Sequence, residues 1–291
     1  MSREIVLPIA ESAQKLENFL SKRFPIGYVR KLFRKNGVRL NGQRVKPDAA
    51  IHPGDRLQLY IPFEQQPKKV WELESIFEDD KLLVINKPAG LAVHEGKRTR
   101  KRDSVLGILE SRYRGKLVPK LIHRLDKDTS GLLLVAKDHD TAKILESRFE
   151  EGSIDKRYLC LLAGRLPRNH GTIDFPLPGR AGNPVQAFTR FKVEKRFSDT
   201  TLVRVRIETG RMHQIRLHFA KLGYPVVMDD QHGDFAFNRS FRKTYGLRRQ
   251  FLHAAQIGLE YGGQKRIWTA PQPDDLKRTV AALESRSRER F

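Results

Sequence analysis

The residues best suited to chemistry lie in one short stretch, Leu121-Ile-His-Arg-Leu-Asp-Lys-Asp-Thr-Ser-Gly-Leu-Leu-Leu-Val-Ala-Lys137. Apolar runs flank its charged centre, so the pattern predicts a strand, a tight polar turn and a second strand. Asp126 and Asp128 are carboxylates that could serve as a nucleophile or a general base, or could simply make turn hydrogen bonds before Gly131. The charged side chains are therefore expected together at one rim of a sheet.

A second candidate segment, Glu208-Thr-Gly-Arg-Met-His-Gln-Ile-Arg-Leu-His218, follows the predicted strand 203–207. It begins with a Thr-Gly turn and is expected to continue as a helix to Leu222. Its arginines and histidines could form an ordinary solvated helix face. Alternatively, one guanidinium could pair with a carboxylate and stabilise its charge in a buried site.

Taken together, these segments resemble the RluA family of RNA pseudouridine synthases. The nonamer His123-Arg-Leu-Asp-Lys-Asp-Thr-Ser-Gly131 resembles the family's active-site motif. An Asn-Lys-Pro-x-Gly turn at 86–90, a Lys-x-Tyr-Leu segment at 156–159 and the Thr-Gly-Arg-x-His-Gln-Ile-Arg segment accompany it in the family's order. The resemblance implies an enzyme that isomerises uridine in RNA to pseudouridine without a cofactor. It also implies an α+β catalytic fold, with a long mixed, largely antiparallel sheet and flanking helices.

Three residues are expected to carry the chemistry. The resemblance places the catalytic aspartate at Asp126 and the aromatic residue of the active site at Tyr158. We assign Arg216 as the guanidinium paired with Asp126, with Arg211 as the second choice. Arg124 is expected to fill the stack that the flipped uridine leaves. Further RNA contacts are expected from His123, which orients the turn or touches phosphate, and from Lys87, Arg211 and His213.

One position departs from the family pattern. The family commonly has Asp-x-x-Tyr-Gly where this chain has Asp229-Asp-Gln-His-Gly233, so His232 replaces the tyrosine. The surrounding run of aspartates lacks the spacing of an EF-hand or another known metal loop, and no metal site is expected.

The composition points to a polyanionic partner. The 291 residues include 56 Lys and Arg against 34 Asp and Glu, a formal net charge of +22. Such an excess favours RNA. No apolar run approaches the ~20 residues of a membrane span, and no signal-peptide pattern occurs, so we expect a cytoplasmic protein. The single cysteine, Cys160, lies in an apolar strand pattern and is expected to be a buried thiol.

Three regions are expected along the chain: an S4-like RNA-binding domain at 1–64, a polar linker at 65–74 and the catalytic domain at 75–291. The first region carries two short helices and an Asn41-Gly42 hairpin. Its resemblance to the S4 domain implies docking on structured RNA through phosphates. The basic residues expected to do so are Arg30, Lys31, Arg34, Lys35 and Arg39.

Within the family, the chain looks most like the RluC/RluD branch, a resemblance that implies bacterial large-subunit (23S) ribosomal RNA or its precursor as the substrate. A transfer-RNA-modifying synthase and a non-catalytic S4-type RNA-binding protein are the alternatives. A glycosidase using Asp126 and Asp128 is disfavoured, because carboxylates two residues apart in a turn rarely flank a sugar. A sequence-specific DNA regulator lacks any supporting motif. We expect a monomer with no obligate protein partner.

Overall fold

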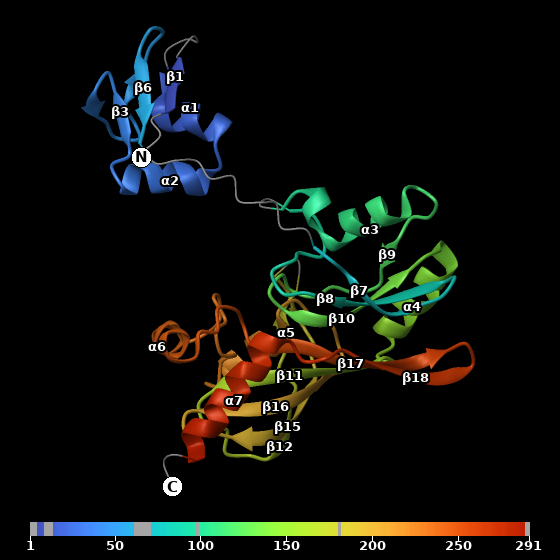
Figure 1. Cartoon of the computed structure of the whole chain (residues 1–291). Coiled ribbons are helices and arrows are strands. Elements are labelled where there is room, and N and C mark those ends of the chain that lie inside the picture. The colour runs from blue at the N-terminus through green and yellow to red at the C-terminus, as the bar shows by residue number, and fades with distance from the viewer. Residues whose placement is uncertain (1–4, 9–13, 61–70, 97–98, 180–181, 289–291) are drawn as a thin grey trace. The chain divides into compact units, whose positions relative to one another are not determined.

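The computed structural model describes residues 5–8, 14–60, 71–96, 99–179 and 182–288. The chain divides into two compact units, Met1–Val70 and Trp71–Phe291, which are described separately (Figure 1). Most of the expected linker, 65–70, lies outside the described residues. Within the described residues, no helix is long and apolar enough to cross a membrane.

Unit 1 is a small α+β module. Its two helices are α1 (Leu16–Arg23) and α2 (Ile26–Arg34). A four-stranded sheet has the order β1 (Ile5–Pro8), β6 (Arg56–Leu59), β3 (Val38–Leu40), β4 (Gln43–Arg44). A separate pair is formed by β2 (Gln14–Lys15) and β5 (Ala50–Ile51). The helices bury one face against the strands. The fully buried side chains of this core include Phe19, Leu16, Leu20, Leu32 and Ile51.

The hairpin predicted in unit 1 is confirmed. Asn41 and Gly42 both have positive φ, 51° and 83°, which is the geometry of the tight turns that match strand twist. The Asn41 side chain also donates to Asp55 at 2.7 Å and accepts from the backbone N–H of Arg56 at 2.7 Å. The hairpin is thereby fastened to the turn that precedes β6.

Unit 2 is built on a ten-stranded sheet whose strands lie side by side in Figure 1. The main path is β12 (His170–Ile173), β15 (Thr189–Arg196), β16 (Thr200–Ile207), β11 (Asp155–Ala163), β17 (Leu252–Tyr261), β10 (Ser130–Ala136), β8 (Leu82–Lys87), β7 (Glu74–Glu78). Off this path, β18 (Gln264–Thr269) pairs with β17 and β9 (Lys120–Leu121) with β10. Only the β10–β17 pair is parallel among these described strands. The mixed, largely antiparallel α+β fold is confirmed, and a two-stranded pair of β13 (Leu177–Pro178) and β14 (Pro184–Val185) stands apart.

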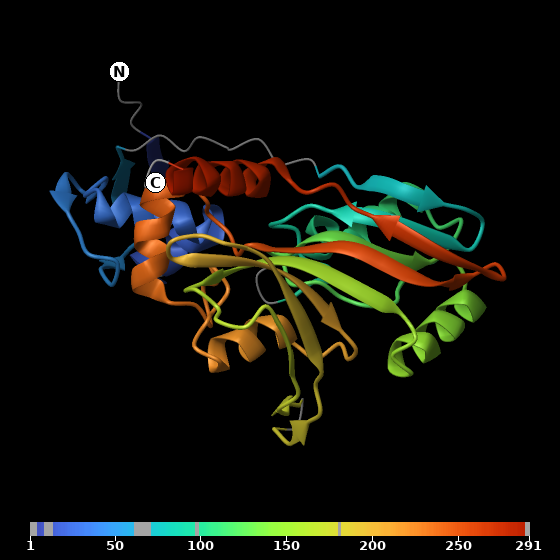
Figure 2. The same cartoon turned by 90° about the horizontal axis from the view of Figure 1, so that it is seen from below.

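Five α-helices and a short 3-10 turn, η1 (Lys101–Asp103), accompany the sheet, and Figure 2 shows them around the twisted strands. They are α3 (Val105–Tyr113), α4 (His139–Glu150), α5 (Gln214–Lys221), α6 (Phe235–Tyr245) and α7 (Asp274–Arg288). Each helix buries side chains in an apolar cluster with the strands. Helices α3 and α5 contribute to one cluster, α4 to a second, and α6 and α7 to a third.

Asp138 caps α4, because its carboxylate accepts the N–H of Thr141 at 2.7 Å. The last helix, α7, ends at Arg288. Helix α6 was not predicted, although its cap residues Asp234 and Gly246 were visible signals.

Strand β17 organises the centre of unit 2. Its first residues pair with β10 and its later residues with β18, while β11 runs along its other edge. The register shifts between Arg157 and Tyr158, where Ala255 of β17 is the extra residue of a bulge. Gly131 of β10 lies very close to the backbone of Ala254 in β17. Its φ is 112°, and a Cβ at this position would lie 2.2 Å from the carbonyl oxygen of Ala254. Only glycine fits this crossing.

The buried His253 makes the stability of unit 2 dependent on pH. Its Nδ1 lies 3.0 Å from the hydroxyl of Ser130, and the side chain is inaccessible to solvent. Burial lowers the pKa of His253 to about 4. In the unfolded chain, His253 has an ordinary pKa of about 6.5, so it binds a proton at a higher pH than in the folded protein. The free energy of unfolding is therefore largest above about pH 6.5 and decreases progressively as the pH falls toward about 4.

We predict that protonation of His253 in the unfolded chain lowers the free energy of unfolding of unit 2 by about 2 kcal/mol when the pH is lowered from 7 to 5. The measurement is urea unfolding followed by tryptophan fluorescence, which reports on unit 2 because both tryptophans, Trp71 and Trp268, lie there. The His253→Gln variant is the control and should lose about 2 kcal/mol less over the same pH interval. Identical pH dependence in the two proteins would contradict the assignment.

Candidate active site

Asp126 lies in the loop between β9 and β10, and this loop is held from two sides. On one side, the turn that follows β8 contacts the carbonyl oxygen of Lys127. The N–H of Gly90 donates to it at 2.8 Å and the ammonium of Lys87 at 3.0 Å. The loop that presents the carboxylate is thereby fixed to the neighbouring strand.

The expected RNA contact by Lys87 is wrong. Its side chain is fully buried, and its ammonium also donates to the carbonyl oxygens of Pro88 at 2.9 Å and Leu91 at 2.8 Å. With all three donors used inside the protein, Lys87 has none left for RNA. Burial lowers the pKa of Lys87 to about 7. Its role is to join the 88–91 turn to the Asp126 loop.

The other side of the loop is held by the segment that leads into β17. The Arg249 guanidinium donates to the Ser130 hydroxyl at 3.2 Å, and the Gln250 side chain donates to the Thr129 hydroxyl at 2.6 Å. Arg249 is itself anchored by both oxygens of Asp275 in α7, at 2.6 and 2.9 Å. The conformation of the loop therefore depends on residues more than a hundred positions later in the chain.

His123 orients the loop rather than offering its Nε2 to RNA. This nitrogen accepts the backbone N–H of Leu134 in β10 at 3.0 Å, and the ring stacks on Phe149 with centroids 4.8 Å apart. Burial lowers the pKa of His123 to about 3, so the ring is neutral at neutral pH. A neutral ring whose Nε2 is already occupied is a poor phosphate ligand. Of the two expected roles, the geometry supports only the first.

Arg216 of α5 is the partner of Asp126. Its NH1 donates to Asp126 Oδ2 at 2.9 Å. Its other two donating nitrogens bind Asp229 in a bidentate pair, with Nε 2.6 Å from Oδ2 and NH2 2.7 Å from Oδ1. The Asp229 side chain is fully buried and that of Arg216 is 4% exposed, whereas Asp126 keeps 24% exposure toward the pocket. One guanidinium thus bridges a buried and an accessible carboxylate.

Asp229 was not among the expected site residues. Burial opposes its charge, but hydrogen bonds from Arg216 and from the N–H groups of His232 and Gln231 outweigh this and hold the pKa of Asp229 below the usual value. Burial also disfavours the Arg216 cation, yet the two carboxylates raise its pKa above the ordinary range. The available sequence signal was an aspartate directly after the apolar run 225–228, which suggests a buried carboxylate that needs a cation.

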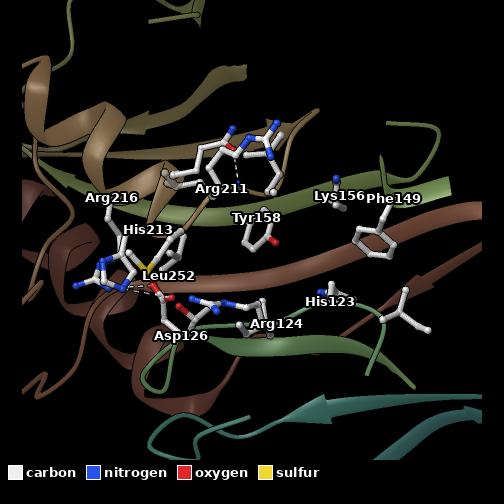
Figure 3. A pocket seen from close by; sticks show the side chains of 18 of the residues that line it. His123, Arg124, Asp126, Phe149, Lys156, Tyr158, Arg211, His213, Arg216 and Leu252 are labelled. Atoms are coloured by element: carbon white, nitrogen blue, oxygen red, sulfur yellow. Dashed lines mark hydrogen bonds and ion pairs between the residues drawn. The ribbon is translucent and has the colours of Figure 1, made fainter. Parts of the chain in front are cut away.

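Tyr158 lies in the middle of a pocket of about 460 Å³. Figure 3 shows Asp126, Arg216 and His213 at one end of it and Lys156, Phe149 and His123 at the other, with Tyr158 between them. Burial and the nearby Asp126 charge raise the pKa of Tyr158, so its hydroxyl remains protonated. The pocket therefore combines a carboxylate, a protonated phenol and an aromatic face.

The remaining expected residues of unit 2 line the same pocket in different ways. Arg124 is exposed at the rim. Arg211 is also exposed and donates to the carbonyl oxygen of Gln186 at 3.2 Å, so it is not the partner of Asp126. The Nε2 of His213 lies 3.7 Å from Asp126 Oδ1. His218, by contrast, is buried away from this site and hydrogen-bonded to Thr189.

In unit 1, the basic residues expected to bind RNA share one helix and the hairpin after it. All are exposed except Arg39, which is half-buried with its guanidinium 5.1 Å from the centre of the Tyr60 ring. None forms an ion pair with a residue that the structure describes, and these residues are Arg30, Lys31, Arg34, Lys35 and Arg39. In the described part of the chain, no group of His, Cys, Asp and Glu could hold a metal ion. Cys160 is buried, as predicted.

Comparison with known proteins reveals extensive similarity. Residues 81–221 match the family described as RNA pseudouridylate synthase. The chain is 34% identical to the ribosomal large subunit pseudouridine synthase C of Escherichia coli O157:H7, over 96% of both chains. It is also 34% identical to the protein of that name from Haemophilus ducreyi, over 94% of this chain and 93% of the relative.

Solved structures share the fold of unit 2. Human RNA pseudouridylate synthase domain containing 4 superposes with a TM-score of 0.62 at 24% identity, covering 72% of this chain and 93% of that one. Human RNA pseudouridylate synthase domain containing 1 gives a TM-score of 0.58 at 25% identity, covering 72% and 87%. The pseudouridine synthase fold is therefore shared with these proteins.

We predict that Asp229→Asn destabilises unit 2 by about 3 kcal/mol, because it leaves the buried Arg216 cation without its main counter-charge. Urea unfolding monitored by tryptophan fluorescence measures this loss. Asp230→Asn is the matched control: the Asp230 side chain is 76% exposed and 3.7 Å from Arg216, so its removal should cost less than about 0.5 kcal/mol. Equal effects of the two substitutions would refute the central position of Asp229.

Proposed function

Since the chain belongs to the RNA pseudouridylate synthase family, we propose that it isomerises particular uridines of large-subunit ribosomal RNA with Asp126 as the catalytic carboxylate. The Asp126–Arg216 pair at the end of an accessible pocket is the observation that carries the proposal. The substrate follows from relatives named as ribosomal large subunit pseudouridine synthases that match almost the whole chain.

The reaction rearranges one nucleoside. The bond between C1′ of the ribose and N1 of uracil breaks, the uracil turns, and C5 joins C1′. C5 loses its proton and N1 gains one, so the change is neither a redox reaction nor a net hydrolysis, and it needs no cofactor. A carboxylate can serve it in two ways, by attacking C1′ or by removing the 2′ proton. The proposal gives Asp126 this role in either route, and Arg216 holds one of its oxygens.

Tyr158 supplies the surface that retains the detached base. Uracil loses its covalent tether in the middle of the reaction, and stacking on an aromatic ring contributes about 1–3 kcal/mol per base. The protonated hydroxyl of Tyr158 can additionally donate to, or exchange a proton with, the uracil. The Tyr158 ring lies between the Asp126 end and the Lys156 end of the pocket (Figure 3), where a base attached to a ribose at Asp126 would be placed.

Arg124 is the residue that compensates for base extrusion. A pocket of about 460 Å³ accommodates one nucleoside but no duplex, so the uridine must leave its stack before Asp126 can reach it. Arg124 stands at the exposed rim, two residues before Asp126. Its planar guanidinium can stack where the base had been.

Unit 1 supplies a second contact with the RNA, in the manner of an S4 domain. Its exposed basic residues follow one face of α2 opposite the buried Tyr28, Val29 and Leu32. Such a face binds phosphates and so provides affinity and orientation, whereas the choice of uridine rests with the pocket. Arg211 adds a positive charge and His213 a polar ring at the pocket itself. We further propose a cytoplasmic monomer that needs no protein partner.

The test of this function is pseudouridine mapping on ribosomal and transfer RNA from cells with and without the gene. Wild type should restore the sites lost from large-subunit RNA, whereas Asp126→Asn, with activity reduced by at least about 10⁴-fold, should restore none. If sites were lost from transfer RNA alone, the substrate would be transfer RNA and not large-subunit ribosomal RNA. Restoration by Asp126→Asn would exclude the catalytic role and leave an RNA-binding function.

We also predict different effects for the two loop residues. Arg124→Ala should weaken binding of the substrate RNA about tenfold, because it removes the side chain that stabilises the flipped state. Asp126→Asn should bind within about twofold of wild type and form no product. Filter binding and single-turnover assays on the same RNA separate these effects. Equal loss of affinity in both variants would contradict this division of roles.

A further inference from the structure

Two imidazole rings lie at the edge of the pocket beside Asp126. His213 precedes α5 in a left-handed backbone conformation with φ 52°. Its Nε2 is 3.7 Å from Asp126 Oδ1, and its Nδ1 is 3.0 Å from Nε2 of His232. The ring planes are inclined at 62° with centroids 5.2 Å apart, so the two rings meet edge to face through a hydrogen bond.

His232 is itself held by the residue that holds Arg216. The backbone N–H of His232 donates to Asp229 Oδ1 at 3.0 Å, the oxygen that also accepts from Arg216 NH2. Arg216 reaches Oδ2 of Asp126, while His213 faces Oδ1. The buried Asp229 carboxylate therefore holds both Arg216 and His232. Arg216 contacts one oxygen of Asp126, and His213, the partner of His232, faces the other.

We propose that His232 is a positioning residue for the reaction: it donates a hydrogen bond to Nδ1 of His213 and thereby fixes the ring proton of His213 on Nε2, facing Asp126. A neutral imidazole carries a single N–H, and the partner of one nitrogen determines which nitrogen bears it. His213 then presents this N–H toward Oδ1 of Asp126, 3.7 Å away. This inference rests on the role proposed above for Asp126.

The opposite direction of the hydrogen bond is electrostatically unfavourable. If His213 donated through Nδ1 to His232, the lone pair of its Nε2 would face the negative oxygen of Asp126. The charged and titratable groups around His213 are Asp126 and Asp229, which favour a cation, and Arg216 and His232, which oppose it. Burial, the largest effect, lowers the pKa of His213, so the ring is neutral at neutral pH and the choice of tautomer matters.

The kinetic test compares two substitutions of similar size. His232→Phe keeps a ring but removes the donor, and should lower kcat about tenfold with KM unchanged. His232→Gln restores an N–H donor and should recover most of kcat. Thermal unfolding of both variants checks that the fold is retained. Wild-type kcat in His232→Phe, or no recovery in His232→Gln, would overturn the proposal.

A second measurement needs no RNA and remains informative if the His232 variants fail to fold. Nitrogen-15 NMR of the histidine rings in the full-length wild-type protein, assigned with His213→Gln, should show Nε2 of His213 protonated and Nδ1 unprotonated at pH 7.5. The Nδ1–H tautomer would refute the inference. Because the tautomer is read without turnover, this result is independent of whether the wild-type enzyme forms pseudouridine, which the mapping experiment decides.

Discussion

The active site depends on one buried guanidinium. A charge removed from water must be compensated nearby, and Arg216, with a side chain only 4% exposed, is compensated mainly by the fully buried Asp229. This pair leaves NH1 free to extend to Asp126 at 2.9 Å. The Asp126 carboxylate is therefore oriented by a cation that cannot move away, because moving it would leave buried charges uncompensated. The geometry of the pair is thus fixed by the free-energy cost of desolvation.

The loop that carries Asp126 is held mainly through its backbone and its small hydroxyl side chains. Lys87 and Gly90 bind the carbonyl oxygen of Lys127, whereas Arg249 and Gln250 bind the hydroxyls of Ser130 and Thr129. Contacts of this kind leave the Asp126 carboxylate and the Arg124 guanidinium free to face the pocket. The lysine of the Asn-Lys-Pro turn thus serves the site without touching the RNA.

Much of this arrangement could be predicted from sequence, because it is local. A run of apolar residues indicated the strand Asp155–Ala163 that presents Tyr158, and the Asn41-Gly42 pair indicated the hairpin of unit 1. What could not be predicted depends on distant segments. A lysine in a turn looks solvent-exposed until three carbonyl groups surround it, and Asp229 looks like one of several acidic loop residues until Arg216 is placed beside it. Periodicity and motif spacing carry no information about such pairings.

The parallel pairing of β10 with β17 has a consequence for biosynthesis. Ser130 aligns with His253, so the strand that follows the Asp126 loop receives this neighbour only after more than a hundred further residues have been made. Contacts of such long sequence separation form late in folding. A nascent chain that ends before Arg249 would contain every recognisable motif, yet its loop would lack the support from Arg249, Gln250 and β17. The set of contacts that supports the Asp126 loop is therefore complete only when translation of the chain has passed Ala254.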